Sequence, residues 1–302
     1  MPRIFGDRNQ LETLDLNYNN LNGKIPKSLT NCKELQILNL GHNQMTDTFP
    51  IMLQSLPKLR ILILSSNKFY GPIWHPHSFF GFANLHIIDL SFNDFTGSLP
   101  SDYFQNWTSM KASYNKGQEI FYVRILIFFI SIDFSNNKFY GEIPSLMGDS
   151  RDLIVLNLSS NNFAGRIPSS LGNLIELESL DLSYNELSGG IPQQLTGLTF
   201  LGYLNLSNNQ LTALIPQAKQ IGTFSKSSFD GNWGLCGPPL SKNCERSPLP
   251  PSHYSEESGD SGLSGFCWKA VAIGYGCGFV IGLMLGHIIT SRSPYLVLRF
   301  FV

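Results

Sequence analysis

A 24-residue pattern is written three times in succession in this chain, in copies that begin at Leu153, Leu177 and Leu201. Each copy follows the consensus LxxLxLxxNxLxGxIPxxLxxL closely. A single copy carries one apolar stripe and cannot bury it alone, so neighbouring copies must cover one another. Self-similarity at this spacing predicts a solenoid in which every copy forms one coil.

The first half of the repeat predicts a short strand, as the copy at Leu177 shows. Leu180 and Leu182 point inward and Asp181 points outward, which is the alternation of a strand. Stacked copies place these strands side by side in a parallel sheet on the concave side of the solenoid. Asn185 follows the strand, where its amide can satisfy backbone groups at a buried turn.

The second half of the repeat predicts a convex side without long helices. Gly189 suits a backbone position with positive φ or a close approach between coils, and Pro192 favours an extended or 3-10 start. Leu195 and Leu198 then close the core. The expected fold class is therefore a solenoid with a parallel β-sheet on its concave side and 3-10 or extended segments on its convex side.

Further copies precede these three, and one stretch interrupts the series. Residues 1–100 hold four copies, and residues 129–216 hold one partial copy and the three regular ones. Residues 101–128 match the consensus poorly. We expect either a degenerate coil or a non-repeat interruption between the two blocks. The earlier copies begin at Leu11, Leu35, Leu59 and Leu85.

Residues 217–244 leave the pattern and predict a C-terminal cap. A cap is needed because the last coil otherwise exposes an apolar end and an unpaired strand edge. Of the five cysteines, only Cys236 and Cys244 look like a pair, and a disulfide between them closes a short Gly-Pro-Pro loop. No comparable cap precedes Leu11, and residues 1–10 hold no secretory signal, so we expect a missing N-terminal portion.

The C-terminal region predicts a membrane anchor. Residues 245–269 are rich in Pro, Ser and acidic side chains and predict a solvated juxtamembrane linker. Residues 270–290 are almost entirely apolar or small, and at about 1.5 Å per residue they match a hydrocarbon core of about 30 Å. We therefore expect a single C-terminal transmembrane α-helix.

The charges on either side of this helix predict its orientation. Acidic side chains precede it, and Arg292 and Arg299 follow it. Positive charge favours the cytoplasmic side, so we expect an extracellular N-terminus and a cytoplasmic tail, residues 291–302, at the plasma membrane. This short tail cannot hold a kinase.

Glycines recur every four residues within the predicted membrane helix and so form one small-residue stripe. Such a stripe lets a second helix approach closely. Glycine is also frequent in membrane helices in general, which is the alternative explanation. We favour a partner helix. The stripe consists of Gly274, Gly278, Gly282 and Gly286.

Composition and motif content exclude several classes of function. A net charge of −1 gives no electrostatic basis for nucleic-acid binding. His75 and His77 flank a proline, but no further ligand is near them in sequence, so we expect no metal site. The Ser and Asp columns are explained by turns and strands. We expect neither an enzyme nor a cofactor.

Outward strand positions predict a partner-binding face on the concave sheet. A cluster of exposed isoleucines there is typical of a surface that contacts another molecule. Two tyrosines lie on the same side. The alternative is an ordinary solvated sheet. The residues of this expected face are Ile37, Ile61, Ile63, Ile87, Tyr184 and Tyr203.

Three N-glycosylation sequons occur, at Asn106, Asn157 and Asn205. Their use would place the solenoid outside the cytosol. In the copies at Leu153 and Leu201, however, the serine two residues after the asparagine also suits the turn. Three sequons are about what chance supplies in a chain rich in Asn and Ser, so both explanations stay open.

The LxGxIP repeats, the ending FDGNWGLCGPPL at residues 229–240, the acidic linker and the single span together resemble plant leucine-rich-repeat receptor-like proteins. The resemblance covers nearly the whole chain and matches the C-terminal part of such a receptor. It implies a leucine-rich-repeat solenoid that binds a peptide, protein or glycan ligand. It also implies that the protein has no kinase of its own. It also implies signalling through adaptor and co-receptor receptor-like kinases, in plant defence or development.

Within this resemblance, Asn106 and Trp107, followed by Asn115 to Gly117, are similar to the borders of the family's non-repeat island. Residues 101–128 then correspond to a shortened island. Two alternatives remain. One is a membrane-tethered inhibitor that resembles the secreted plant repeat proteins that bind pathogen wall-degrading enzymes. The other is a truncated receptor without a signalling function.

Overall fold

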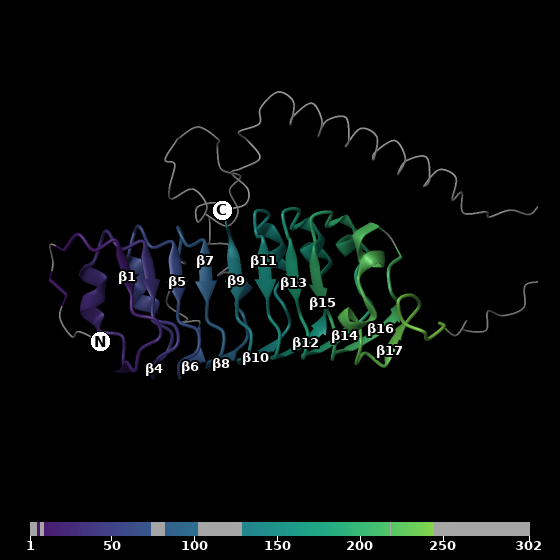
Figure 1. The fold of residues 1–302 in the computed structure, drawn as a ribbon, viewed down its shortest axis with the longest axis horizontal. Helices are drawn as coiled ribbons and strands as arrows, with labels where there is room; N and C mark the ends of the chain where they lie inside the picture. Colours follow the sequence, from purple (N-terminus) through teal and green to yellow (C-terminus); the bar gives the residue numbers. More distant parts are fainter. Residues whose placement is uncertain (1–4, 7–8, 74–81, 102–128, 218, 245–302) are drawn as a thin grey trace, which may run out of the picture. The chain divides into compact units, whose positions relative to one another are not determined.

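The structure is a computed structural model that describes residues 5–6, 9–73, 82–101, 129–217 and 219–244 (Figure 1). The chain divides into two units, Met1–Arg246 and Ser247–Val302, and every described residue belongs to the first. That first unit consists of stacked coils whose strands pair in parallel, as the 24-residue period predicts. The solenoid is therefore confirmed.

Eight strands from successive coils form the first sheet, and each pairs with its neighbours along the chain (Figure 1). Leu156, Leu180 and Leu204 share one register position, and all three are buried. This register confirms the predicted alternation of inward leucines with outward residues. The strands are β1 (Thr13–Asp15), β3 (Ile37–Asn39), β5 (Ile61–Ile63), β7 (Ile87–Asp89), β9 (Ser131–Asp133), β11 (Val155–Asn157), β13 (Ser179–Asp181) and β15 (Tyr203–Asn205).

A second parallel sheet, which the sequence did not predict, comes from the segment after the conserved asparagine of each coil. Leu187 is its inward residue in one coil, and Gly189 at φ +76° ends the strand. Each strand has only one inward residue, so the sequence shows no period-two alternation from which the strand could be predicted. The sheet contains β17 (Gly234–Cys236), β16 (Gln210–Leu214), β14 (Glu186–Gly189), β12 (Asn162–Arg166), β10 (Lys138–Gly141), β8 (Asp94–Gly97) and β6 (Tyr70–Pro72), and a separate pair contains β2 (Asn22–Gly23) and β4 (Gln44–Met45).

Short 3-10 helices follow the second sheet, as the prolines of the repeat predict. Pro192 precedes one of them in an extended conformation, with φ −60° and ψ 132°, because its ring fixes φ there. The described helices are η1 (Lys27–Asn31), η2 (Ile51–Ser55), η4 (Ser145–Asp149), η5 (Ser169–Asn173), η6 (Gln193–Gly197), η7 (Lys219–Thr223) and η8 (Lys226–Ser228).

A ladder of buried asparagines connects the coils. The Asn185 side-chain oxygen accepts the Phe163 N–H of the preceding coil at 3.0 Å, and its Nδ2 lies 3.0 Å from the Leu158 oxygen. The same arrangement recurs in neighbouring coils, so backbone groups at each turn find partners without water. The other buried members are Asn43, Asn137, Asn161, Asn209 and Asn232.

The two repeat blocks stack directly on each other. Strand β7 pairs with β9 in register, so no coil lies between them in the first sheet. A column of buried phenylalanine rings continues across the same junction, with centroids 6.0–6.2 Å apart. These rings belong to Phe69, Phe95, Phe139 and Phe163.

In the part of the chain that the structure describes, no helix has the length and apolar character needed to cross a membrane. The expected membrane helix, residues 270–290, lies outside that part, together with its linker, its tail and the four stripe glycines.

Candidate ligand-binding face

The expected isoleucine cluster exists as a contiguous row but is less exposed than predicted. Ile37, Ile61 and Ile87 share one register position on β3, β5 and β7, and Ile63 lies two residues beyond Ile61. Ile61 is buried, with 7% of its surface exposed, and the other three are half-buried. The prediction of an exposed Ile61 is wrong, because in-register side chains on adjacent strands cover one another.

The two predicted tyrosines lie apart from the isoleucines, one on the first sheet and one at the turn after it. Tyr203 begins β15, is 50% exposed, and donates its hydroxyl to Asp181 Oδ2 at 3.1 Å. Tyr184 follows β13 and is 60% exposed. Strands β9 and β11 separate both from the isoleucine row. The structure therefore divides the six predicted residues into an apolar group and an aromatic group.

Carboxylates and amides occupy the third position of every strand of the first sheet except β5, where Ile63 lies. Asn157 Nδ2 donates to Asp133 Oδ2 at 3.1 Å, and Asn205 Nδ2 lies 3.4 Å from Asp181 Oδ2. Along β9 to β15, an amide thus lies between successive acidic side chains. This alternation reduces the repulsion between carboxylates one strand apart.

At the junction of the two repeat blocks, two acidic residues are direct neighbours. Asp89 on β7 and Asp133 on β9 share one register position. Burial raises the pKa of the Asp133 carboxyl, and the charge of Asp89 raises it further, while hydrogen bonds from Ser135 and Asn157 oppose the rise. This adjacency was not visible in the sequence, because the two residues belong to different blocks.

A row of exposed rings lies at the turn that follows the strands, and sequence reasoning missed its conformation. Tyr18, His42, Phe92 and Tyr184 all have positive φ, between +49° and +53°. Bulky side chains adopt this region rarely. Tyr18 and His42 stack with centroids 4.1 Å apart. All four rings belong to the residue just before the conserved asparagine of a coil. The consensus specifies no residue type at that position, so the repeat pattern gave no indication of its conformation.

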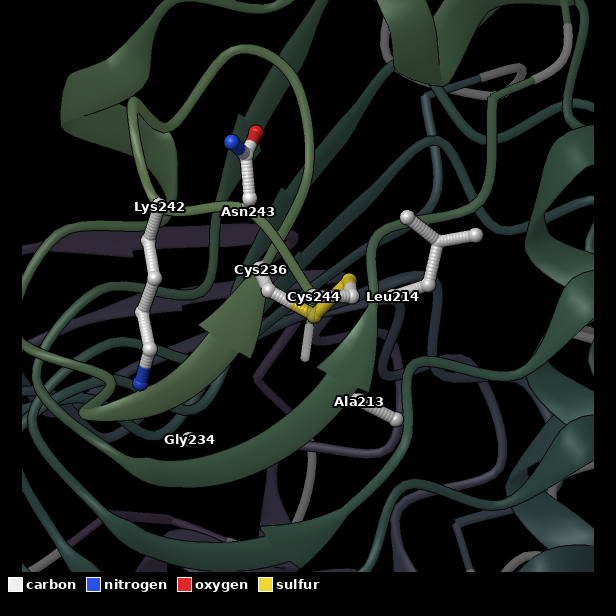
Figure 2. Close-up of a pocket in the computed structure, with 7 residues that line it drawn as sticks. All are labelled: Ala213, Leu214, Gly234, Cys236, Lys242, Asn243 and Cys244. Atoms are coloured by element: carbon white, nitrogen blue, oxygen red, sulfur yellow. A yellow bond between two sulfur atoms is a disulfide. The ribbon is translucent and has the colours of Figure 1, made fainter. Parts of the chain in front are cut away.

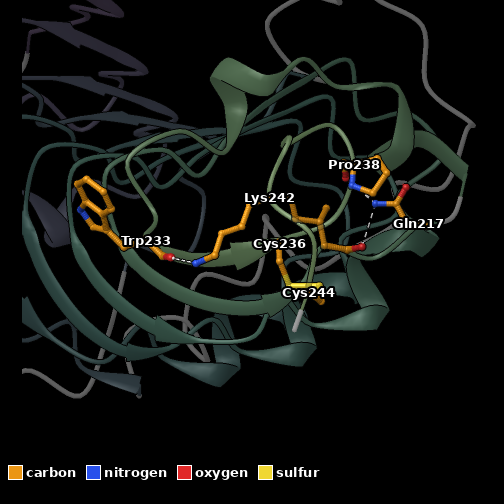
Figure 3. Close-up of a disulfide and its surroundings, with 7 residues drawn as sticks. Gln217, Trp233, Cys236, Pro238, Lys242 and Cys244 are labelled. Atoms are coloured by element: carbon orange, nitrogen blue, oxygen red, sulfur yellow. Dashed lines mark hydrogen bonds between the residues drawn. A yellow bond between two sulfur atoms is a disulfide. The ribbon is translucent and has the colours of Figure 1, made fainter. Parts of the chain in front are cut away.

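The cap holds the disulfide between Cys236 and Cys244, with the Cα atoms 5.0 Å apart. Figure 3 shows two contacts that brace its loop. Lys242 Nζ donates to the Trp233 carbonyl at 2.7 Å, and Gln217 Nε2 donates to the Pro238 carbonyl at 2.6 Å. These contacts fix the loop within the cap, and the cap joins the last coil where β17 pairs with β16.

An open cavity of about 460 Å³ adjoins this disulfide (Figure 2). Lys242 is its charged lining residue, and that ammonium group is already bonded to a backbone carbonyl. The lining therefore offers no free group for acid, base or nucleophilic chemistry. The lining residues are Ala213, Leu214, Gly234, Cys236, Lys242, Asn243 and Cys244.

The pKa shifts of two titratable side chains away from this face, His86 and Cys32, are explained by burial in the fold. Burial lowers the pKa of His86, whose Nδ1 lies 2.7 Å from the Asn84 oxygen, so the neutral form is favoured. Cys32 is buried in the core, and this burial raises its thiol pKa. Within the described ranges, no three His, Cys, Asp or Glu side chains gather in a way that could hold a metal ion. His75 and His77 lie outside those ranges.

Two of the three sequon asparagines lie within the described residues. Asn157 ends β11 and Asn205 ends β15, and both are half-buried on the first sheet. Asn106 lies outside the described residues.

Comparison with known proteins supports a receptor class. A "Leucine rich repeat" family profile matches residues 9–69 and 151–211, and a second one matches residues 84–106. Receptor-like protein 50 of Arabidopsis thaliana is 54% identical over 96% of this chain and 35% of that protein. The relatives are receptor-like proteins, a non-enzymatic class. This chain spans about a third of the length of the curated relatives it matches.

Solved structures agree on the fold. A plant ice-binding protein has a TM-score of 0.63 at 26% identity, over 78% of this chain and 69% of that chain. The Arabidopsis receptor kinase HAESA, in complex with the peptide hormone IDA and the co-receptor SERK1, has a TM-score of 0.58 at 31% identity. That match covers 74% of this chain and 38% of HAESA.

Proposed function

Because this chain belongs with the leucine-rich-repeat receptor-like proteins of plants, we propose that it is part of a cell-surface receptor without a kinase of its own. In this proposal the first sheet faces the outside of the cell and binds a peptide. The bound receptor then signals through partner receptor kinases, in defence or development.

One observation carries the proposal, namely the three half-buried isoleucines of the row, Ile37 on β3, Ile63 on β5 and Ile87 on β7. Coil stacking requires the inward leucines but does not require isoleucine at outward positions. The other coils carry Ser, Thr, Asp or Asn there, apart from Val155 on β11 and Tyr203 on β15. Apolar side chains that are neither core nor fully exposed retain surface that another molecule can cover. An extended peptide laid across the strands contacts Ile37, Ile63 and Ile87 together.

Partner chemistry follows from the same relatives. HAESA binds a peptide hormone and a co-receptor. By analogy, this chain takes a peptide on the first sheet and a co-receptor kinase beside it. The glycine stripe Gly274, Gly278, Gly282 and Gly286 then supplies the contact with a kinase helix inside the membrane.

The experiment captures peptides on the full chain in plant membranes. The membranes are incubated with apoplastic fluid and washed, and the retained peptides are identified by mass spectrometry. Ile63→Arg places a charge in the row and should abolish retention of the peptides that the unchanged chain enriches. The control is Ile175→Arg, since Ile175 is 54% exposed and follows η5, away from the first sheet.

Equal retention by the Ile63→Arg and Ile175→Arg chains would remove the isoleucine row from the proposal. If no peptide is enriched on the unchanged chain over empty membranes, the peptide-receptor function is wrong. Both variants must reach the membrane in equal amounts, which an immunoblot of the same fractions measures.

A further inference from the structure

The outward face of the first sheet carries acidic side chains and no basic ones. Asp15, Asp89, Asp133 and Asp181 each end one of its eight described strands, and these strands contain no lysine or arginine. Arg60 precedes β5 by one residue, and three residues along a strand, roughly 10 Å, separate it from the level of the aspartates. Among the described residues, no ion pair involves these four aspartates. The face therefore favours a partner with positive charge.

Apolar and acidic side chains meet at the third position of these strands. Ile63 on β5, Asp89 on β7 and Asp133 on β9 are successive partners in register. Strands in a sheet are about 4.8 Å apart, so Ile63 lies roughly 7 Å from the middle of the two aspartates. The isoleucine row thus continues directly into a pair of carboxylates, Asp89 and Asp133, which we call the acidic pair.

The hydrogen bonds of the acidic pair leave acceptor positions for a further donor. Asp89 Oδ1 accepts from the Ser91 N–H at 2.9 Å and from the Ser91 hydroxyl at 2.6 Å. Asp133 Oδ1 accepts from the Ser135 N–H at 2.9 Å, and its Oδ2 accepts from Asn157 Nδ2 at 3.1 Å. A carboxylate offers about four acceptor positions. Among the described residues, Asp89 Oδ2 has no hydrogen-bond partner.

A cation between the two carboxylates would relieve their repulsion. In the described strands, Asp89 and Asp133 are the one pair of acidic residues that are direct neighbours in register. Burial and the charge of Asp89 both raise the pKa of the Asp133 carboxyl, as expected for like charges that share a partly desolvated place. A guanidinium group suits the pair best, because its planar fork of five N–H donors bonds two oxygens at once.

We propose that the peptide bound on the first sheet places an arginine on the acidic pair, two residues from an apolar side chain that contacts the isoleucine row. The inference rests on the proposed peptide binding and names the class of peptide. In an extended chain, side chains two residues apart point to the same side and lie about 6.7 Å apart. This spacing matches the distance from Ile63 to the acidic pair. A peptide with one residue between its apolar and its arginine side chain therefore fits the face.

Asparagine replacements remove the charges and keep the hydrogen bonds of the turn. Asn157 occupies the same strand position, and its Oδ1 accepts from the Ser159 N–H at 3.1 Å and from the Ser159 hydroxyl at 2.7 Å. These are the bonds that Asp89 makes in its own coil. The double variant Asp89→Asn and Asp133→Asn should therefore keep the fold and lose both charges.

Asp181→Asn is the matched control. Asp181 Oδ1 accepts from the Ser183 N–H at 2.9 Å and from the Ser183 hydroxyl at 2.6 Å, the same distances as for Asp89 and its serine. Strands β9 and β11 separate Asp181 from β7, where the isoleucine row ends. This variant removes one charge from the sheet and leaves the acidic pair intact.

The first test selects peptides on the full chain from a random decapeptide library by mRNA display. Cell-free synthesis into lipid nanodiscs under oxidising conditions supplies the protein and adds no sugar to the Asn-x-Ser triplets that the variants create. We expect the unchanged chain and Asp181→Asn to enrich peptides with an arginine two residues from an apolar side chain. The double variant should lose the preference for arginine and keep the preference for the apolar side chain.

The second test separates charge from fold. An enriched peptide and its counterpart with citrulline, which has the shape of arginine without the charge, are titrated by fluorescence polarisation. The unchanged chain should bind the citrulline peptide about tenfold more weakly than the arginine peptide. The double variant should bind both peptides equally.

Three results would overturn the inference and leave the peptide-receptor function standing. They are enriched peptides without a basic residue at this spacing, a preference for arginine that persists in the double variant, and a double variant that fails to bind even the citrulline peptide. The last result would show that the two aspartates act through the fold. No enrichment of any peptide over empty nanodiscs would contradict the peptide-receptor function as well.

Discussion

Replacing Asn185 by Ala should destabilise the solenoid far more than replacing Asn19 by Ala. Asn185 is buried, and its loss leaves the Phe163 N–H without its hydrogen-bond partner. The carbonyls that its Nδ2 contacts keep other partners, for example Asn209 Nδ2 on the Leu182 oxygen at 2.9 Å. The orphaned N–H costs about 1–3 kcal/mol, and the hydrogen bonds made by the two Nδ2 hydrogens cost about 1 kcal/mol each. The sum is about 3–5 kcal/mol.

Asn19 is the matched control because it belongs to the first described coil. Its Nδ2 donates to the Leu16 and Asn17 oxygens of its own coil, and the residue is exposed. Water replaces such bonds, so Asn19→Ala should cost less than about 1 kcal/mol.

The assay is urea unfolding of the full chain in detergent, with the free energy of unfolding taken from the midpoint at constant slope. Hydrogen exchange adds a local readout, because the Phe163 amide should lose protection in Asn185→Ala only. Equal midpoint shifts for the two variants would refute the ladder as a stabilising element. Unchanged protection of the Phe163 amide would show that its hydrogen bond to Asn185 is not what shields it.

Three further results are expected. Leu180→Asp should cost several kcal/mol in the same unfolding assay, since it buries an unpaired charge, whereas Asp181→Ala should cost about 1 kcal/mol; equal midpoints would contradict the strand register. Asp133→Asn should flatten the pH dependence of stability, because the fold raises the pKa of Asp133 and the unchanged protein therefore loses stability as the pH rises from about 4 through that raised pKa. Parallel pH profiles of stability for the two proteins would show that Asp133 is not the cause. Filling the stripe with the double change Gly278→Leu and Gly282→Leu should keep membrane insertion and reduce kinase co-precipitation, and undiminished co-precipitation at equal abundance would exclude the stripe as the contact.

The sequence by itself determined the repeat and its register. Leu180 and Leu182 are inward because alternation along a strand is a local property, and a 24-residue period fixes which residues of adjacent coils pair. The same locality predicted the Asn185 turn, the positive φ of Gly189 and the 3-10 segment after Pro192. These features depend on residues within one copy, so the sequence of that copy is sufficient to predict them.

The tertiary structure decided what lies beside what on the surface. Ile61 is buried because in-register neighbours on two other coils cover it, and no property of its own copy reveals that. Asp89 and Asp133 become neighbours because β7 pairs directly with β9 across the interruption. The second sheet likewise exists only when successive coils align their short extended segments. Burial, charge proximity and pairing are relations between copies, and the distance between copies is set by packing rather than by sequence spacing.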